Sequence, residues 1–317
     1  MLYPIIALLI GFIVLVWSAD RFVIGAAGTA RNFGMSPMLI GLTVVSFGTS
    51  APEILVSTMA ASTGAGELAV GNALGSNIAN IGLVLGITAL IAPLPVKSAV
   101  LKREVPLLIA ITLLAGGVLY DLHLGYVDSI LLCLSLIACL FLFARFQRSA
   151  SAKDIEDETE ELPELPTSKA IFWLILGLVL LAASSRLLVW GATEIALELG
   201  ISELIIGLTI VAIGTSLPEL AASVASALKG HTDIALGNIV GSNIFNIAAV
   251  MAVPGLIAPI DLDSMVLWRD YGVTLSLTLL LAVFALWQKP PRISRYEGAM
   301  LVFAYAAYLS LLYTMSI

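Results

Sequence analysis

The chain is poor in charged residues. Only 12% of its 317 residues are Asp, Glu, Lys or Arg, whereas 60% are hydrophobic and the mean hydropathy is +1.05. Soluble globular domains carry about 25% charged residues, because these residues cover the surface that faces water. A composition this apolar excludes a water-soluble globule and places the chain in a lipid bilayer.

Cysteine and histidine are almost absent. The two cysteines, Cys133 and Cys139, lie in one apolar run, and a spacing of six residues does not place them on the same helix face. The two histidines, His123 and His231, are predicted in short loops. These counts argue against a disulfide framework and against a zinc or copper site. Much of the acidic excess behind the net charge of -7 lies at 154–161, a stretch that we interpret as a solvated loop.

Apolar stretches long enough to cross a bilayer recur along the whole chain. About 20 helical residues span roughly 30 Å of hydrocarbon. The predicted fold class is therefore an all-α membrane protein with ten transmembrane helices, at 2–18, 37–61, 68–92, 104–120, 126–146, 170–190, 203–228, 234–258, 268–287 and 297–314.

Basic residues are distributed unevenly among the connections between these spans. All Lys and Arg residues except Arg186 and Arg269 follow odd-numbered spans. Because cytoplasmic loops are enriched in Lys and Arg, we predict a multi-pass protein of the inner (cytoplasmic) membrane with both termini outside, periplasmic in a Gram-negative cell. Asp20 and Arg21 are expected to close the first span at the interface, with a gate as the alternative. Solvated loop ends are expected at Glu67, Asp128, Asp261, Asp263 and Asp270.

The two halves of the chain repeat one pattern. A shift of 166 residues superposes 48–53 (GTSAPE) on 214–219 (GTSLPE) without a gap. The same shift superposes 71–80 (GNALGSNIAN) on 237–246 (GNIVGSNIFN). Each copy contains five predicted spans, an odd number, so the second copy must enter the membrane in the opposite direction.

The predicted organisation is therefore a pair of inverted five-helix repeats. The first repeat is expected at 1–146 and the second at 170–317, joined by an acidic cytoplasmic linker at 147–169. Inverted repeats are typical of secondary transporters, whose binding sites lie near the bilayer midplane where broken helices of the two halves meet.

Each repeat carries one glutamate deep within an apolar span, Glu53 in the first and Glu219 in the second. An ionisable group there costs ~3 kcal/mol or more and is usually functional, and a bound cation would offset that cost. The preceding residues, Pro52 and Pro218, lack the amide proton that would bond the carbonyl four residues earlier. Backbone oxygens are therefore expected to be free at these points, and such oxygens are ligands for hard cations.

Side chains that bear oxygen recur at intervals of four residues near both glutamates. They are Thr49, Ser57, Asn72, Ser76 and Asn80 in the first repeat and Thr215, Ser223, Asn238, Ser242 and Asn246 in the second. Small residues that are expected to let the helices approach closely are Gly71, Gly75, Gly237 and Gly241. An oxygen-only set with two carboxylates indicates calcium or sodium. A packing role alone is the alternative for Asn72, Asn77, Asn238 and Asn243.

At these motifs the chain resembles the sodium/calcium exchanger branch of the calcium/cation antiporter superfamily, and it is most similar to the bacterial inner-membrane calcium/sodium antiporters. The resemblance covers essentially the whole chain. It implies that calcium is bound by the carboxylates of Glu53 and Glu219 and by the carbonyls of Thr49 and Thr215. It also implies a role for these further positions in sodium binding and at the centre of the site: Ser46, Ser50, Ser76, Asn80, Ala212, Ser216, Ser242 and Asn246.

One position departs from the pattern of this family. Well-studied exchangers often have Asp where this chain has Asn246, so the site holds two carboxylates. Two negative charges are balanced by one calcium ion, two sodium ions or two protons. The predicted function is antiport of calcium for sodium by alternating access, with calcium/proton or sodium/proton antiport as the alternative.

Other function classes fit the sequence less well. A channel would be expected to carry a repeated filter loop, and an intramembrane hydrolase a zinc-binding motif or paired catalytic aspartate motifs. None of these occurs in the sequence. We therefore expect no enzymatic activity and no cofactor. The expected partners are calcium and sodium ions and the lipid bilayer, with no nucleic acid, and nothing in the sequence indicates an oligomeric state.

Overall fold

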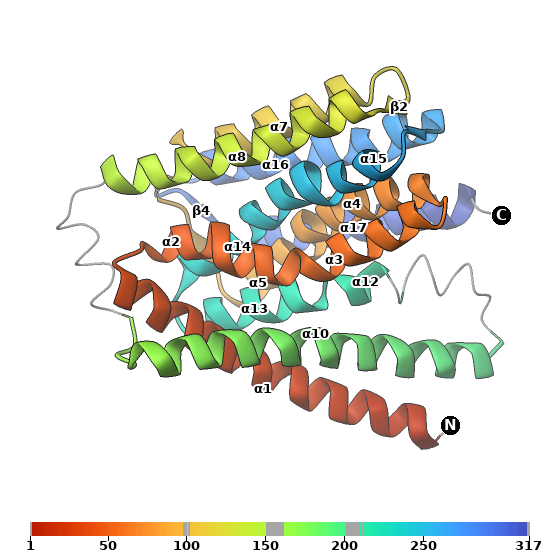
Figure 1. Cartoon of the computed structure of the whole chain (residues 1–317). Coiled ribbons are helices and arrows are strands. Elements are labelled where there is room, and N and C mark those ends of the chain that lie inside the picture. The colour runs from red at the N-terminus through yellow and green to blue at the C-terminus, as the bar shows by residue number, and fades with distance from the viewer. Residues whose placement is uncertain are drawn as a thin grey trace.

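The structure, a computed structural model, is built almost entirely of helices (Figure 1). It describes residues 2–97, 100, 102–149, 162–200, 210 and 212–315. In the labels, α denotes an α-helix, η a π-helical segment and β a strand. The first half contains α1 (Leu2–Phe33), α2 (Pro37–Ile40), η1 (Gly41–Val45), α3 (Ser46–Ser62), α4 (Gly66–Ala79), η2 (Asn80–Leu85), α5 (Gly86–Ile91), β1 (Leu94–Pro95), α7 (Glu104–Val118), β2 (His123–Leu124) and α8 (Tyr126–Ser149).

The described part of the second half follows a similar order of elements, with η5 as an additional segment before α16. It contains α10 (Thr167–Glu198), α12 (Ala212–Thr215), α13 (Leu217–Leu228), α14 (Thr232–Phe245), η4 (Asn246–Val250), α15 (Ala252–Ile257), β3 (Ile260–Asp261), η5 (Val266–Tyr271), α16 (Gly272–Trp287), β4 (Arg292–Ile293) and α17 (Arg295–Met315). Two π-helical segments are at equivalent positions of the repeat, because η2 begins at Asn80 and η4 at Asn246.

Eight of the described helices are long and apolar enough to cross a membrane. They correspond to eight of the ten predicted spans. The fourth predicted span is represented by α7, an apolar helix of 15 residues. Of the seventh predicted span, 203–228, the structure describes residue 210 and the residues from 212 onward, in α12 and α13.

The first helix of each half is longer than the sequence indicated. Both α1 and α10 contain 32 residues, so Asp20 and Arg21 lie inside a helix and do not close the first span. The helix continues because the residues after Arg21 are apolar and pack against α10. The two backbones are close there, since a Cβ atom built on Gly177 would lie 2.7 Å from Cα of Phe22.

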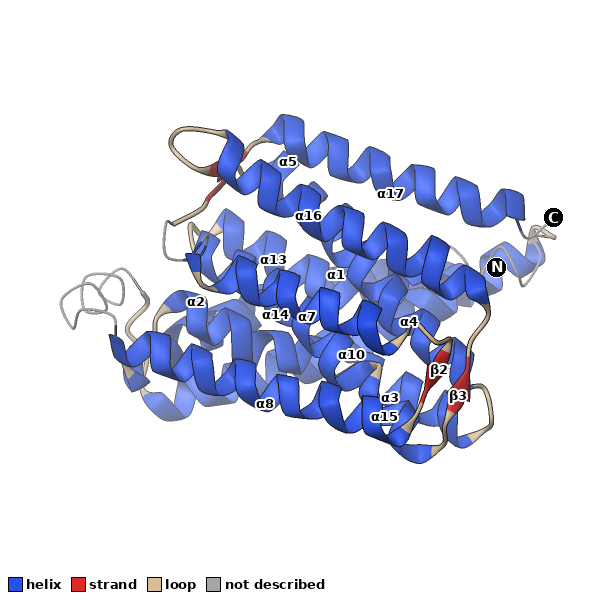
Figure 2. Cartoon of the chain, turned by 90° about the horizontal axis from the view of Figure 1, so that it is seen from above, coloured by secondary structure: helices blue, strands red, loops and turns tan. Residues whose placement is uncertain are grey.

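Two short strand pairs join the halves at opposite ends of the helix bundle. β1 pairs antiparallel with β4, placing Leu94 opposite Ile293, and β2 pairs antiparallel with β3, placing Leu124 opposite Ile260. Figure 2 shows the β2–β3 pair at one end of the bundle. Each pair contains one strand from each half, so the two halves are connected at both the β1–β4 end and the β2–β3 end.

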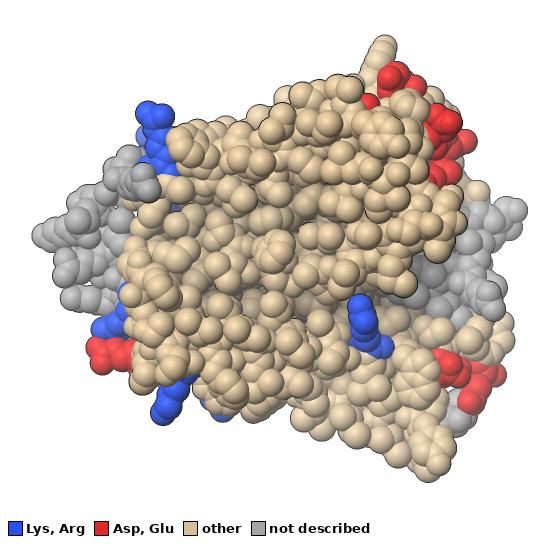
Figure 3. Space-filling view, in the orientation of Figure 1, with Lys and Arg blue, Asp and Glu red and all other residues tan. Residues whose placement is uncertain are grey.

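Charged side chains gather at these two ends. Figure 3 shows mostly Lys and Arg at the left end and mostly Asp and Glu at the right end of the view. Among the acids expected at loop ends, Glu67, Asp261 and Asp263 are exposed. Asp270 is different, because it is buried, accepts two hydrogen bonds from Arg269 at 2.7 and 3.0 Å and accepts a third from the Tyr308 hydroxyl at 2.9 Å.

The connection between the halves is described only at its edges. α8 continues to Ser149 and α10 begins at Thr167, while residues 150–161 of the predicted 147–169 linker lie outside the described residues. Before α10, the Arg31 guanidinium forms an ion pair of 2.5 Å with Glu164 and donates to the carbonyl of Leu162. These contacts attach the start of α10 to the end of α1.

The most buried long helices are Gly66–Ile91 and Thr232–Ile257, which occupy equivalent places in the two halves. Helix α14 packs against η1, α3 and α13, and α4 packs against α3. Helices α1 and α10 pack along each other on one side of the bundle, away from α7 and α8 (Figure 1). The centre of the bundle is therefore formed by the four segments that carry the duplicated polar motifs.

Candidate cation site

Glu53 lies in the middle of α3, at the centre of the bundle. Only 1% of its surface is exposed, and among the described residues neither carboxylate oxygen has a hydrogen-bond partner. The helix is continuous from Ser46 to Ser62 with Pro52 inside it. A carboxylate that is buried without donors is costly, and a bound cation is one way to compensate for its charge.

Glu219 lies in the first turn of α13, and it is as deeply buried as Glu53. Here the chain is interrupted, because Ser216 lies between α12 and α13 with φ -89° and ψ 3°. Ser50 Oγ lies 3.5 Å from Oε1 of Glu219 and donates to it, whereas Oε2 has no partner among the described residues. Ser50 is three residues before Glu53, so the two glutamate segments face each other across the two halves.

Pro218 has no amide proton to donate to the carbonyl oxygen of Gly214, but this oxygen is not left free as the sequence predicted. Ser185 Oγ on α10 donates to it at 2.6 Å. The residue equivalent to Ser185 in the first half is Ala19, which has no hydroxyl to donate. This difference between the halves accompanies a second one, since the helix is broken near Pro218 and continuous through Pro52.

Two asparagines hold the backbone of the glutamates. Asn72 Nδ2 donates to Ser57 Oγ at 2.9 Å and lies 3.4 Å from the carbonyl oxygen of Glu53. Asn238 Nδ2 donates to Ser223 Oγ at 2.9 Å and lies 3.4 Å from the carbonyl oxygen of Glu219. These two asparagines therefore do more than fill a packing surface.

A further polar contact crosses between the halves. Thr49 Oγ1 donates to Oδ1 of Asn238 at 3.2 Å and lies 3.4 Å from Ser242 Oγ. Thr49, Asn238 and Ser242 are all fully buried. The contact links the glutamate segment of the first half to the asparagine helix of the second.

Asn80 and Asn246 begin the π-helical segments η2 and η4. Each is 1% exposed, and neither its amide oxygen nor its amide nitrogen has a partner among the described residues. Buried polar groups are almost always hydrogen-bonded, and π-helical segments are frequent at functional sites. Two unpartnered amides at symmetric positions are therefore suited to a ligand.

Comparison with known proteins gives one consistent assignment. A family model described as sodium/calcium exchanger protein matches residues 3–145 and 169–314. The chain belongs to the sodium/calcium exchanger family. CaxA of Alkalimonas amylolytica, named as a candidate antiporter, is 50% identical over 99% of this chain and 100% of its own length. The inner membrane protein YrbG of Escherichia coli K12 is 42% identical over 100% of this chain and 98% of its own.

Solved structures agree with this assignment. The sodium-calcium exchanger NCX_Mj is similar to this chain with a TM-score of 0.84 and 34% identity, over 98% of each chain. Membership of this family identifies a membrane transporter, not an enzyme, and it matches the resemblance that the duplicated motifs indicated.

Most of the site residues predicted for this family lie in the interior. The buried ones are Ser46, Thr49, Ser50, Glu53, Ser76, Asn80, Ser216, Glu219, Ser242 and Asn246. Thr215 is half-buried at the end of α12, and Ala212 begins that helix. Within the described part of the chain, no three His, Cys, Asp or Glu side chains form a cluster that could hold a metal ion. Any cation at this place would therefore depend on two carboxylates with neutral oxygens.

Close helix contact differs between the two halves. A Cβ atom built on Gly237 would lie 2.6 Å from the carbonyl oxygen of Met38, and one on Gly241 would lie 2.6 Å from that of Leu42. Atoms built on Gly71 and Gly75 would meet nothing within 4 Å among the described residues. The repeat equivalents of Met38 and Leu42 are positions 204 and 208, outside the described residues. The predicted close approach is confirmed for the second pair of glycines only.

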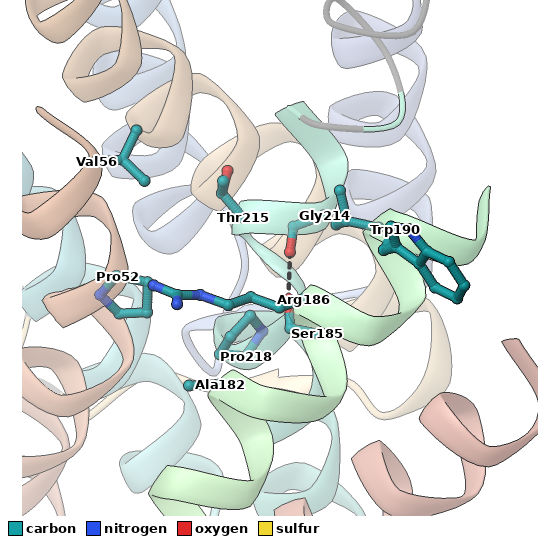
Figure 4. A pocket seen from close by; sticks show the side chains of 10 residues that line it. Pro52, Val56, Ala182, Ser185, Arg186, Trp190, Gly214, Thr215 and Pro218 are labelled. Carbon is teal, nitrogen blue, oxygen red and sulfur yellow. Dashed lines mark hydrogen bonds between the residues drawn. The ribbon is translucent and has the colours of Figure 1, made fainter. Parts of the chain in front are cut away.

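A cavity of about 220 Å³ lies beside the glutamate segments. Its lining includes the residues that precede the two glutamates, Pro52 and Pro218, together with Ser185 and Arg186 of α10 (Figure 4). The sequence motifs did not single out these α10 residues. The signal was available in the repeat, because a shift of 166 residues pairs Ser185 with Ala19 and Arg186 with Asp20, and both pairs differ in chemistry.

Proposed function

We propose that the protein is a secondary antiporter that exchanges calcium for sodium across the cytoplasmic membrane by alternating access. The observation that carries this proposal is the pair of buried glutamates, Glu53 and Glu219, whose segments meet between the two halves and which together have three carboxylate oxygens without a partner among the described residues. Family membership and the likeness to a sodium-calcium exchanger support the same ions.

Charge balance gives the proposed site its coupling. Moving two uncompensated carboxylates through the low-dielectric interior costs several kcal/mol per charge. One calcium ion or two sodium ions would neutralise them. With either set of ions bound, the site could switch its access from one side of the membrane to the other. An empty site would retain two uncompensated negative charges, and their cost would oppose the conformational change. Exchange, and not leak, follows from this arrangement.

The proposed ligands are oxygens from both halves. Calcium is assigned to the carboxylates of Glu53 and Glu219 with the backbone carbonyls of Thr49 and Thr215. Side chains and carbonyls that complete the calcium and sodium positions are assigned to Ser46, Ser50, Ser76, Asn80, Ala212, Ser216, Ser242 and Asn246. The unpartnered amides of Asn80 and Asn246 support this assignment, since both are buried and the segments that they begin pack against the glutamate helices, η2 against α13 and η4 against α3.

The proposed architecture is ten transmembrane helices in two inverted repeats, 1–146 and 170–317, with a linker at 147–169. Three observations support it: η2 and η4 lie at equivalent positions, each strand pair contains one strand from each half, and the family match is interrupted between residues 145 and 169. The basic β1–β4 end is assigned to the cytoplasm and the acidic β2–β3 end, with both termini, to the outside.

Calcium uptake into calcium-free proteoliposomes and calcium release from calcium-loaded ones test the function. Calcium movement is measured with an imposed sodium gradient, an imposed pH gradient in sodium-free buffer, and no gradient. We expect the sodium gradient to drive calcium flux, and we expect Glu53→Gln and Glu219→Gln each to reduce it to the level of protein-free liposomes. Glu67→Gln makes the same chemical change at an exposed position and is expected to keep the full rate.

Each arm of this assay has a distinct meaning. Calcium flux that ignores the sodium gradient but follows the pH gradient would replace the proposal with calcium/proton antiport at the same two glutamates. That alternative rests on Asn246, because a site with two carboxylates is neutralised by two protons as well as by two sodium ions. Retention of flux in both glutamine variants would refute the site itself.

A further inference from the structure

Arg186 is a basic residue far from either charged end of the bundle. It lies in α10 (Thr167–Glu198), twelve residues before the end of that helix, which at 1.5 Å per residue is about 18 Å. Ionisable residues at such depth face a protein interior or a water-filled cavity and are usually functional.

The cavity beside the glutamate segments provides that environment. Arg186 lines it together with Pro52, Pro218, Gly214 and Thr215. Figure 4 shows the Arg186 side chain extending from α10 toward Pro52, the residue that precedes Glu53. Among the described residues Arg186 is exposed and has no ion-pair or hydrogen-bond partner. Its charge is therefore uncompensated next to the two glutamate segments.

The equivalent residue of the first half has the opposite charge. A shift of 166 residues pairs Arg186 with Asp20, and the structure confirms this register, because the hydroxyls of Ser18 and Ser184 each donate at 3.0 Å to the carbonyl three residues earlier. Asp20 is compensated by Lys229 at 2.5 Å. The two inversely oriented halves thus place a paired acid at one position and an unpaired base at the other.

We propose that Arg186 is a selectivity residue at the entrance of the cation path on the β2–β3 side, where it opposes calcium more strongly than sodium. This inference rests on the proposed antiport function. Coulomb energy is proportional to the charge of the ion, so the repulsion of a divalent ion is twice that of a monovalent ion at the same place. A doubled energy squares the effect on local concentration.

The expected size of the effect of Arg186 on local ion concentration follows from the same relation. At about 10 Å in a water-like medium, one positive charge lowers the local concentration of a monovalent ion by about 2-fold and that of a divalent ion by about 4-fold. A lower dielectric in the cavity enlarges both factors but preserves the square between them. The paired Asp20 position produces no such bias, so the discrimination acts from one side of the membrane only.

The test measures half-saturating concentrations of calcium and of sodium on each face, in right-side-out and inside-out membrane vesicles. Arg186→Gln is expected to lower the value for calcium by the square of its effect on sodium, and only from the β2–β3 face. Arg186→Lys retains the charge and is expected to keep the ratio of the unsubstituted protein. Lys169→Gln removes a charge from the opposite end of the same helix and is expected to leave both β2–β3-face values unchanged.

The outcomes separate this inference from the function on which it rests. Absence of sodium-dependent calcium flux in the unsubstituted protein would refute the proposed function. If exchange is intact, then equal changes for the two ions, or equal changes from both faces in Arg186→Gln, would refute the role of Arg186. If the glutamine variant is not inserted, a calcium-to-sodium ratio altered in Arg186→Lys would refute it as well, because the charge is still present.

Discussion

Asn238 repeats in the second half the pair of contacts that Asn72 makes in the first, at the same two distances of 2.9 and 3.4 Å. Each asparagine fixes the helix that carries it against the glutamate of the preceding helix. The two differ in one respect, because Oδ1 of Asn238 also accepts a hydrogen bond from Thr49 at 3.2 Å. Asn238 therefore connects the halves, and Asn72 acts within one half.

This difference predicts unequal effects of substitution. Asn72→Ala and Asn238→Ala are each expected to lower the free energy of unfolding by about 1–3 kcal/mol, since buried partners are left without hydrogen bonds. Asn238→Ala is expected to weaken calcium binding further, because it also releases Thr49. Thermal unfolding in detergent, with and without calcium, measures both effects. A larger loss of the calcium-induced shift in Asn72→Ala would contradict the assignment.

Much of the candidate site could be proposed from the sequence, because the two repeats can be compared with each other within one chain. Chance does not place a proline and a glutamate at the same register twice in apolar spans, so Glu53 and Glu219 could be singled out from the sequence. Their burial followed from the apolar surroundings. Exchanger-family membership, confirmed by the match to nearly the whole chain, was also carried by these motifs.

Other features depend on contacts that a pattern of residues does not contain. The sequence underestimates the length of α1, because the charged pair Asp20 and Arg21 is typical of a helix end. In the structure Arg21 lies over the rings of Trp17 and Trp173 and the helix continues. The duplicated motif also suggested equal helix breaks. Among the described residues, α3 is continuous through Pro52, whereas the equivalent segment of the second half is interrupted at Ser216, and Ser185 donates to the carbonyl oxygen of Gly214.

A third carboxylate is predicted to change the electrical behaviour of transport. With Glu53 and Glu219 alone, exchange of one calcium ion for two sodium ions moves no net charge. Asn246→Asp adds a negative charge at a fully buried position, which requires a third monovalent cation for balance. We expect exchange by the unsubstituted protein to ignore an imposed membrane potential and exchange by Asn246→Asp to depend on it.

Valinomycin-clamped proteoliposomes measure this dependence. Asn80→Asp is the matched variant, because Asn80 is the repeat equivalent of Asn246 and is equally buried. It is expected to produce the same dependence on potential. Potential-dependent exchange in the unsubstituted protein would contradict the charge count.

The β2–β3 strand pair is predicted to respond to pH. Asp261 Oδ1 lies 2.7 Å from Nδ1 of His123, and this hydrogen bond raises the pKa of His123 above its ordinary value of about 6.5. A raised pKa in the folded state stabilises the fold fully below about pH 6.5, and this contribution is lost as the pH rises through the folded-state value. The connection between the halves at this end is therefore expected to weaken in alkali.

Melting temperatures at pH 6 and pH 8 check the sign of this effect. His123→Gln is expected to reduce the drop in melting temperature between these two pH values. The same substitution made in an Asp261→Asn background is expected to have no further effect, because the partner is already removed. A pH response of His123→Gln equal to that of the unsubstituted protein would contradict the assignment. The pair is exposed, so the shift is expected to be small.

Glycine at position 237 is predicted to be required where α14 crosses α2 and η1. A Cβ atom there would lie 2.6 Å from the carbonyl oxygen of Met38 and 3.0 Å from the amide nitrogen of Leu42, and backbone atoms cannot move aside singly. Gly237→Ala is therefore expected to cost about 1–3 kcal/mol or more in the free energy of unfolding. Gly117→Ala is the matched control, since its Cβ would meet nothing within 4 Å among the described residues and alanine favours a helix. Urea or thermal unfolding in detergent is expected to show a loss for the first variant and no loss for the second. Equal stability of the two variants would mean that η1 and α14 are not held in contact at this crossing.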